Sequence, residues 1–370
     1  MWQPQGLYNQ FVLRIPLILK GDEAVRGLYN FPCERIAVIH EPFFKDQGLF
    51  KTVFKKKEVR FFVRSWNGEP DLAGLSGTLS EIEVFHPDTF IAVGGGSVMD
   101  GTKLCRLFYE LPYYTPGNRI DGSVLKTKFI AIPTTVGSGA EVSSAAIFVK
   151  DHHKEMIVLH EFQPDAVVFD ERYVRETPEK ILYASGLDAM SHLIEGYVSK
   201  NENSMTDVLA EKGLEMVRNE LDHLMKKEDI DFFRFQYGGF LGGIVQNHCV
   251  VGAAHGVAHQ LTELGYSHGE AVGLLLAASI KENMKDEATR NKYQVLAKKS
   301  GFDSAEELIT FIEKVCMVSG INSRKAELKE ILLKKEKDAA FMDNIRNDRG
   351  GKGNPIEMTD GYLKQLFRSV

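Results

Sequence analysis

The chain has 370 residues, which is long for a single hydrophobic core and accommodates two domains. Its composition, 44% apolar and 26% charged, is that of a globular protein. The net charge is −6 and the longest basic run is only Lys55, Lys56 and Lys57, so nucleic acid is not expected as a partner. The four cysteines lack CxxC spacing, which argues against a zinc ribbon or disulfide scaffold and indicates a reducing compartment.

The N-terminal segment contains the first apolar run, Phe11–Leu19. It is interrupted by Arg14 and Pro16 and no basic region precedes it, so we interpret it as a first strand and not as a signal peptide. No apolar stretch approaches the roughly eighteen residues that would span a bilayer. We therefore expect a cytoplasmic protein with no membrane partner.

Strands and helices alternate through about the first 170 residues. Short apolar runs closed by Gly, Pro or Asp are typical of strands that are buried on both faces. Such runs cover 35–40, 59–63, 89–95, 128–135 and 165–170. Leucine and isoleucine recur at helical spacing between the second and third runs. This alternation predicts an α/β domain with a mostly parallel sheet and helices on both of its faces.

The character of the sequence changes after Asp170, where strand-like runs nearly disappear. The segment 177–199 reads as a helix with Thr177 as its N-cap and Pro178 as its first residue. Later segments repeat the helical pattern, with apolar side chains along one stripe. We expect an α/β domain over 1–175 and an all-helical domain over 176–370.

Three glycines directly follow a predicted buried strand and precede a helix. Gly94, Gly95 and Gly96 would let the backbone approach a ligand closely and adopt positive φ. Ser97 and the amides after it would lie at a helix N-terminus, where an anion such as a pyrophosphate is favoured. The pattern is not GxGxxG, so a tight turn that binds nothing stays open as an alternative.

A second loop of small residues follows the next strand and supplies Thr134, Thr135 and Ser138. Both loops lie at the carboxyl ends of strands, which is where open α/β sheets bind their ligands. Glu41, at the end of the strand 35–40, is suitably placed to accept hydrogen bonds from a ribose 2′-hydroxyl. A carboxylate there would repel a 2′-phosphate and favour NAD over NADP, although a surface glutamate without a role fits equally.

The second half contains a group of potential metal ligands. Asp188 and His192 lie four residues apart and so share one helix face, as do His255 and His259. His268 follows a Gly-Tyr turn and is free to fold back toward that face. One carboxylate with two or three imidazoles would make a four-ligand site for a divalent first-row metal, and a proton relay is the alternative.

These motifs resemble the iron-containing (group III) alcohol dehydrogenase family, and they follow the family's order along almost the whole chain. The resemblance is carried by GGGSVMD (94–100), PTTVGSGAEVS (133–143), GLDAMSHLIEGY (186–197), HGVAHQL (255–261) and SHGEAVGL (267–274), together with NGEP (67–70) and GNPIEMT (353–359). It implies a nucleotide-binding α/β domain, an all-helical domain and an active site in the cleft between them.

The resemblance also assigns roles to individual residues. The metal ligands would be Asp188, His192, His255 and His268, and the remaining histidine, His259, would lie near the nicotinamide and the substrate and act in catalysis. The nucleotide contacts would be Gly95, Gly96, Ser97, Asp100, Thr134, Thr135, Ser138 and Lys154. The metal would be Fe(II) or Zn(II), the nucleotide NAD with NADP as an alternative, and the assembly a homodimer.

The implied activity is hydride transfer between the nicotinamide and a small alcohol or aldehyde. The chain has GSGAE (137–141) where the family has GTGSE, and the loop before His268 is one residue shorter and lacks a proline, which leaves the substrate open. Arg346, Arg349 and Lys352 suggest an anionic substrate, and a sugar-like one is equally admissible.

Two further readings of the same motifs remain. One is a dehydroquinate-synthase-like or glycerol-dehydrogenase-like enzyme with the same NAD and metal site. The other is a nucleotide-sensing protein without enzymatic activity. This interpretation predicts the loss of at least one metal ligand, whereas all four ligand positions are filled.

Overall fold

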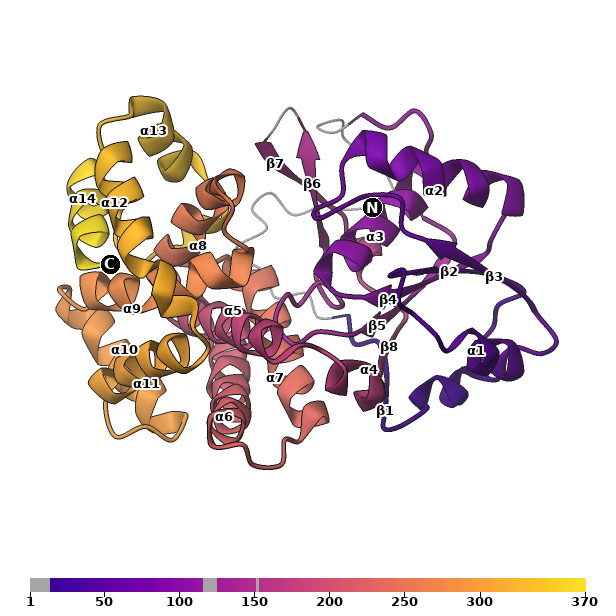
Figure 1. Ribbon diagram of the computed structural model, residues 1–370, viewed down its shortest axis with the longest axis horizontal. Helices are drawn as coiled ribbons and strands as arrows, with labels where there is room; N and C mark the ends of the chain where they lie inside the picture. Colours follow the sequence, from indigo (N-terminus) through magenta and orange to yellow (C-terminus); the bar gives the residue numbers. More distant parts are fainter. Residues whose placement is uncertain (1–13, 116–124, 151–152) are drawn as a thin grey trace. The chain divides into compact units, whose positions relative to one another are not determined.

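The computed structural model describes residues 14–115, 125–150 and 153–370. The contacts between residues divide the chain into two compact units. Their described residues lie within 14–177 and 178–370. The first unit holds every strand of the described chain, and the second holds only helices and 3-10 turns (Figure 1). This distribution confirms the predicted fold class, an α/β part followed by a helical part. The assignment of nucleotide and metal binding to the ranges 1–175 and 176–370 stays a prediction.

The first unit is built around six parallel strands, with a separate antiparallel hairpin. Its strands are β1 (Leu17–Lys20), β2 (Arg35–His40), β3 (Glu58–Val63), β4 (Thr89–Gly94), β5 (Lys128–Pro133), β6 (Ala145–Lys150), β7 (His153–Val158) and β8 (Ala166–Phe169). Its helices are α1 (Gln47–Val53), α2 (Leu72–Phe85), α3 (Gly96–Glu110) and α4 (Glu171–Arg175), with 3-10 turns η2 (Ala24–Leu28) and η3 (His160–Phe162).

The parallel sheet has the strand order β1-β8-β5-β4-β2-β3. Each hydrogen-bonded pair in it is parallel. The strand predicted at 11–19 overlaps β1, and its residues 11–13 lie outside the described chain. The sequence did not predict the hairpin of β6 and β7. Its pattern alternates buried and half-buried residues over only six positions in β6, which is a weak signal in a sequence.

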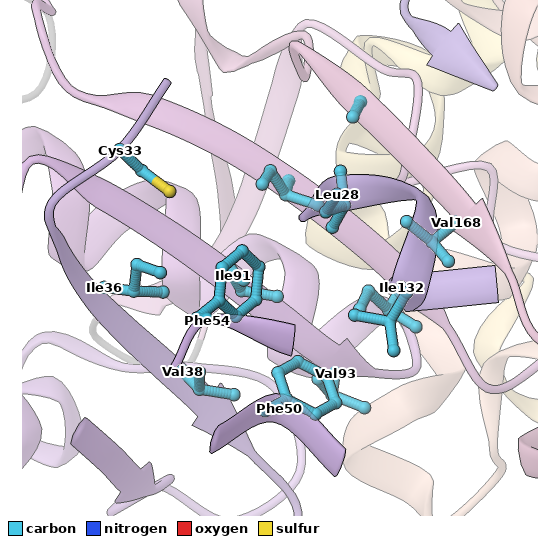
Figure 2. Packing of buried hydrophobic residues seen from close by; sticks show 13 residues of the cluster. Leu28, Cys33, Ile36, Val38, Phe50, Phe54, Ile91, Val93, Ile132 and Val168 are labelled. Atoms are coloured by element: carbon cyan, nitrogen blue, oxygen red, sulfur yellow. The ribbon is translucent and has the colours of Figure 1, made fainter. Parts of the chain in front are cut away.

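One face of the sheet forms a hydrophobic core with the segments that follow β1 and β2. Val38, Ile91 and Ile132 come from three neighbouring strands and are buried together with Leu28 of η2 and Phe50 of α1 (Figure 2). Alternate residues of a strand point to the same face, so these apolar runs supply two buried faces at once. The carboxyl ends of β2, β4 and β5 are thereby held at one edge of the sheet, because all three strands run in the same direction.

The second unit consists of helices that pack around the first helix of the unit, most of which is buried. They are α5 (Glu179–Val198), α6 (Ser204–Lys226), α7 (Phe232–Cys249), α8 (Ala253–Ala258), α9 (His268–Asn283), α10 (Glu287–Lys299), α11 (Ala305–Val318), α12 (Lys325–Lys335), α13 (Ala339–Asn347) and α14 (Asp360–Ser369). The 3-10 turns are η4 (His259–Leu264), η5 (Ile321–Arg324) and η6 (Gly350–Gly353). Within α5 every residue from 186 to 198 is buried.

The predicted start of the helix α5 was wrong by one residue. Pro178 is the N-cap and the helix begins at Glu179. The Thr177 hydroxyl does not cap the helix, because it donates a hydrogen bond of 2.9 Å to the carbonyl oxygen of Thr134. None of the helices in the described parts of the chain is long and apolar enough to cross a bilayer.

Candidate metal centre and nucleotide-binding loops

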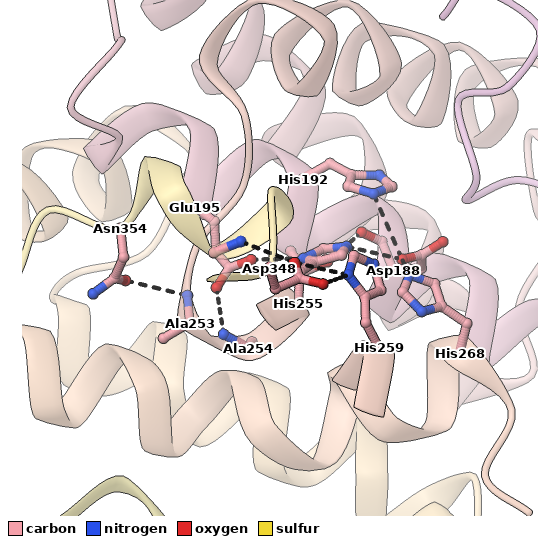
Figure 3. Close-up of polar contacts among 12 residues, drawn as sticks. Asp188, His192, Glu195, Ala253, Ala254, His255, His259, His268, Asp348 and Asn354 are labelled. Atoms are coloured by element: carbon pink, nitrogen blue, oxygen red, sulfur yellow. Dashed lines mark hydrogen bonds and ion pairs between the residues drawn. The ribbon is translucent and has the colours of Figure 1, made fainter. Parts of the chain in front are cut away.

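Three helices of the second unit bring the predicted metal ligands together. Asp188 and His192 lie one turn apart on α5, His255 lies on α8, and His268 is the first residue of α9 (Figure 3). The start of α9 is fixed by Glu270, whose carboxylate accepts hydrogen bonds from the backbone amide and the hydroxyl of the N-cap residue Ser267, at 3.3 and 2.8 Å.

The three imidazoles converge on one carboxylate oxygen. The Nε2 atoms of His192, His255 and His268 lie 3.7, 3.6 and 3.5 Å from Oδ1 of Asp188. The ligand atoms of Asp188, His255 and His268 all lie within 4.8 Å of one another. Asp188, His192 and His255 are buried, and the His268 side chain is 28% exposed. The cluster is therefore closed on one side and open at His268.

These distances fit a metal ion better than they fit hydrogen bonds. They exceed the range of an N–H···O bond, and neither Oδ1 of Asp188 nor Nε2 of His255, both buried, has a hydrogen-bond partner within residues 14–115, 125–150 and 153–370. Four ligands about 2.0–2.2 Å from a tetrahedral metal would lie roughly 3.3–3.6 Å apart. Buried polar atoms without a partner are costly, so this donor set is suited to a divalent cation.

The charges in the centre are coupled. Burial alone would raise the pKa of Asp188, but the imidazoles of His192, His268 and His255 outweigh it and hold that pKa below its usual range. Burial opposes the charged form of His255, yet the carboxylates of Asp188 and Glu195 raise its pKa to about 9. A cation at this position is therefore favoured by two carboxylates, and a bound metal would take the place of the proton.

Glu195 holds His255 from the side opposite Asp188. Its Oε2 lies 2.6 Å from Nδ1 of His255, and both side chains are 2% exposed. A carboxylate only accepts hydrogen bonds, so Nδ1 carries a hydrogen, and once a metal takes the place of the second proton Nε2 would present its lone pair to the centre. Oε1 of Glu195 accepts from the backbone amide of Ala254 at 2.8 Å. One buried side chain thus orients a ligand and satisfies the first turn of its helix.

The N-terminus of α8 is also tied to the C-terminal part of the chain. Oδ1 of Asn354 accepts hydrogen bonds from the amide of Ala253, at 3.2 Å, and from the side chain of Asn283, at 3.0 Å. The N-cap of α8, Gly252, has no side chain, so residues distant in the sequence satisfy its free amides. The loop GNPIEMT therefore helps to place His255.

The remaining histidine of the cluster, His259, begins η4 directly after α8. Its ring stacks on that of His268, with centroids 5.4 Å apart, and stands edge-on to that of His255, 6.0 Å away. Its Nδ1 lies 3.0 Å from both carboxylate oxygens of Asp348. The structure thus places His259 beside the four predicted ligands without making it part of the set that converges on Asp188 (Figure 3).

In the first unit the two small-residue loops meet at the carboxyl ends of β4 and β5. The backbone amide of Thr134 donates to the carbonyl of Gly94 at 3.0 Å. None of Gly94, Gly95 and Gly96 has a positive φ, so that expectation was wrong. Their lack of a side chain serves close packing instead: a Cβ on Gly96 would lie 2.9 Å from Cβ of Ser138, and one on Gly95 would lie 3.3 Å from Thr135.

Gly95 caps α3 without a side-chain hydrogen bond, so the first amides of this helix point toward the loop end of the sheet. The Ser97 hydroxyl is already used within the unit, because it donates to the carbonyl of Gly68 and accepts from the indole N–H of Trp66, at 3.1 Å. Lys154, on β7, donates to Glu69 at 2.8 Å. The predicted role of these two side chains in nucleotide binding is thus indirect or requires an exchange of partners.

Glu41 follows β2 as expected, and its carboxylate forms an ion pair with Arg64. Nε of Arg64 donates to Oε2 of Glu41 at 2.7 Å, and the two side chains are only 18% and 14% exposed. Nη1 of Arg64 also donates to the carbonyl of Trp66, at 3.0 Å. The charge of Glu41 is therefore balanced by a guanidinium that sequence reasoning missed, because Arg64 belongs to a different strand end.

Asp100 lies on the buried face of α3 and acts within the fold. Its Oδ2 accepts from the amide of Ile147 at 3.1 Å, and the buried ammonium of Lys103 donates to Oδ1 at 3.4 Å. Lys103 also donates to the Ser143 hydroxyl, at 3.0 Å, and to the carbonyl of Ala145, at 2.7 Å. This cluster fastens the glycine loop to the segment that follows β5.

Comparisons with known proteins match both units to one family. A model described as iron-containing alcohol dehydrogenase matches residues 19–171, and a model of the C-terminal part of the Fe-containing alcohol dehydrogenase family matches 182–370. The chain belongs to the iron-containing alcohol dehydrogenase family. It is therefore an oxidoreductase of the alcohol dehydrogenase class, and the predicted family and enzyme class are confirmed.

Individual relatives of this family resemble the chain over most of its length. An alcohol dehydrogenase from Thermococcus barophilus is 28% identical and covers 81% of both chains. An NADPH-dependent butanol dehydrogenase from Clostridium saccharobutylicum is 29% identical and covers 77% of both. The solved structure of an iron-containing alcohol dehydrogenase from Thermococcus thioreducens superposes with a TM-score of 0.85 at 27% identity, over 95% of this chain and 97% of that one.

Two residues that contact the histidines of the candidate metal centre, Glu195 and Asp348, were not predicted from the sequence. Glu195 could have been found, since Asp188, His192 and Glu195 follow the i, i+4, i+7 spacing of one helix face. Asp348 could not, because 89 residues separate it from His259 and no local pattern links them.

We expect the substitution Glu195→Gln to weaken Zn(II) binding about 10- to 100-fold, because the neutral amide holds the His255 tautomer less strongly. Competition with a chromophoric chelator measures the affinity. Glu220→Gln is the matched control, since Glu220 is also a buried glutamate of the second unit but contacts Asp231 and Arg234 instead of a histidine ligand. Equal affinities in the two variants would contradict the role of Glu195.

A second prediction concerns pH and the buried Glu141, beside the loop after β5. Burial raises its pKa from 4.5 to about 7, against the opposing effects of its own backbone amide and Lys103. The folded protein therefore binds more protons than the unfolded chain between these values, so stability falls as the pH rises through them. We therefore expect Glu141→Gln to have a higher free energy of unfolding relative to wild type at pH above 7 than at acidic pH. The difference between the two conditions should be on the order of 2–3 kcal/mol.

Urea unfolding at acidic and alkaline pH measures this difference. The control variant is Glu81→Gln, which removes one carboxylate from an exposed position of α2. The same pH dependence in wild type and Glu141→Gln would show that Glu141 is not held in its neutral form.

Proposed function

We propose that this protein is a metal-dependent alcohol dehydrogenase or aldehyde reductase that transfers a hydride between NAD(P) and a small alcohol or aldehyde. The observation that supports it most is the convergence of three imidazole Nε2 atoms on one buried oxygen of Asp188. The proposed ligands are Asp188, His192, His255 and His268. One carboxylate with three imidazoles suits Fe(II) and Zn(II) alike.

A divalent metal bound here supplies a Lewis acid that polarises the substrate oxygen. The protein's own residues prepare the site for it. Glu195 keeps the Nε2 lone pair of His255 directed at the centre. Asp188, His192 and His255 are shielded from water, so charges there interact more strongly than in solvent. His268 is partly exposed, so we propose that the substrate reaches the centre from the side of His268.

His259 is the proposed acid–base group. Its Nδ1 is engaged by Asp348, and its side chain is 23% exposed. In alcohol oxidation it would accept the hydroxyl proton at Nε2, and in aldehyde reduction it would return that proton to the product oxygen. Hydride transfer itself requires the nicotinamide carbon and the substrate carbon to be in contact, which is the task of nucleotide and substrate positioning.

The nucleotide would bind to the first unit through Gly94, Gly95 and Gly96 and the first turn of α3, whose free amides and dipole favour a pyrophosphate. Ser97, Asp100, Thr134, Thr135, Ser138 and Lys154 complete the proposed set. Both NAD and NADP are compatible with the ribose end, because Arg64 neutralises Glu41. The NADPH dependence named for the butanol dehydrogenase relative is consistent with this wider choice.

For the substrate we propose a small anionic or sugar-like alcohol or aldehyde. Of the three cations predicted to select an anion, Arg346 pairs with Asp343 and Asp360, and Lys352 donates to the carbonyl of Arg346 at 3.0 Å. The exposed Arg349 has no side-chain partner among the described residues, so it is the one best suited to an anion. A homodimer, a cytoplasmic location and an active site between the two domains stay predictions from the sequence.

The test is transfer of deuterium from NADH labelled at the hydride position to a panel of short aldehydes, both neutral and anionic, by protein loaded with Fe(II) without oxygen or with Zn(II). We expect one deuterium on the carbinol carbon of the product, with the label lost in His255→Ala and retained in His223→Ala, an exposed histidine of α6. Absence of transfer from every loaded preparation would contradict the proposal. Substrate turnover without net change in NADH would instead favour the dehydroquinate-synthase-like reading.

A further inference from the structure

The contact between His259 and Asp348 determines which nitrogen of the imidazole carries the hydrogen. Nδ1 lies 3.0 Å from each of the two carboxylate oxygens. A carboxylate accepts hydrogen bonds and does not donate them, so the hydrogen of a neutral ring must be on Nδ1. Nε2 then carries the lone pair, and no residue of the described chain donates a hydrogen bond to it.

Asp348 is itself held in place. Its Oδ1 accepts from the backbone amide of Gly351 at 3.2 Å, and its own amide donates to Ile345, at the end of α13, also at 3.2 Å. The backbone at Gly350 closes over the pair: a Cβ there would lie 2.8 Å from Cε1 of His259 and 2.9 Å from Oδ1 of Asp348. A larger residue at 350 would therefore require the ring, the carboxylate or the backbone to shift.

The ring lies where its orientation matters for the proposed chemistry. It stacks on His268 at a centroid distance of 5.4 Å and an interplanar angle of 16°. A ring flipped by half a turn about the Cβ–Cγ bond would keep this stacking but exchange Nδ1 with Cδ2 and Nε2 with Cε1, and the two neutral tautomers would stack equally well. Stacking alone therefore does not select the tautomer, and the selection rests with Asp348.

We propose that Asp348 is a positioning residue, which fixes His259 in the tautomer with hydrogen on Nδ1 and the lone pair on Nε2, and that proton exchange with the substrate hydroxyl depends on this tautomer. The inference rests on the proposed function, since it assigns His259 the proton transfer. The glycine turn η6 provides the close backbone approach that keeps the carboxylate against the ring.

The first test is nitrogen NMR of the full-length protein with ¹⁵N-labelled histidine, metal-free and loaded with Zn(II). The His259 signals are identified by their absence in His259→Gln. We expect the hydrogen on Nδ1 in wild type. In Asp348→Asn the amide group can donate to Nδ1, so the hydrogen should move to Nε2. Asp343→Asn, an exposed aspartate of the same helix α13, should leave the spectrum unchanged.

Kinetics supply the second readout. For Asp348→Asn we expect kcat for aldehyde reduction to fall about 10²- to 10⁴-fold with KM nearly unchanged, the pattern that follows loss of the correct imidazole tautomer. A merely structural role would lower the yield of folded protein and leave kcat per bound metal intact. Asp343→Asn should match wild type in both constants.

Hydrogen on Nε2, or on both nitrogens, of His259 in the wild-type protein would overturn the proposal whatever the enzyme's activity. An unchanged kcat in an Asp348→Asn protein whose tautomer has switched would overturn it as well. Failure of the proposed function is distinguishable, because a wild type that transfers no hydride to any aldehyde would still give the nitrogen spectrum.

Discussion

The second unit depends on one physical constraint, the burial of the Asp188 carboxylate among three imidazoles with no hydrogen-bond partner for its Oδ1 among the described residues. Such a group is expensive in a fold unless a cation completes it. The fold nevertheless places the three imidazole Nε2 atoms 3.5 to 3.7 Å from Oδ1 of Asp188. These distances are longer than hydrogen bonds and close to the distances between ligand atoms around a metal. This unfavourable burial supports the proposal that the cluster binds a metal ion.

Two further carboxylates each hold one histidine at Nδ1. Glu195 holds His255 at Nδ1 from the same helix that carries Asp188, and Asp348 holds His259 at Nδ1 from the end of α13. The two pairs differ in exposure, with His255 buried and His259 partly open to solvent. This difference fits the proposed roles, since a metal ligand needs a fixed lone pair away from water and an acid–base group must exchange protons.

Local patterns in the sequence predicted the parallel strands, the helical second half and the pair of Asp188 and His192, because burial and helical spacing are properties of neighbouring residues. The partners that complete the site could not be predicted in this way. Asp348 and Asn354 reach α8 from about a hundred residues away, and Arg64 reaches Glu41 from the next strand. Positive φ was wrongly predicted for the glycines 94–96, because close packing against Val98, Thr135 and Ser138 is what limits side chains there.

The central claim is that the residues around Asp188 hold a metal, and its most direct test is the metal content of the purified protein. The protein is incubated with Fe(II) without oxygen, or with Zn(II), freed of unbound ions and analysed by mass spectrometry. The account predicts about one equivalent of metal per chain in wild type, as expected for a single four-ligand site, and almost none in Asp188→Ala. No metal in wild type, or the same content in both proteins, would contradict it.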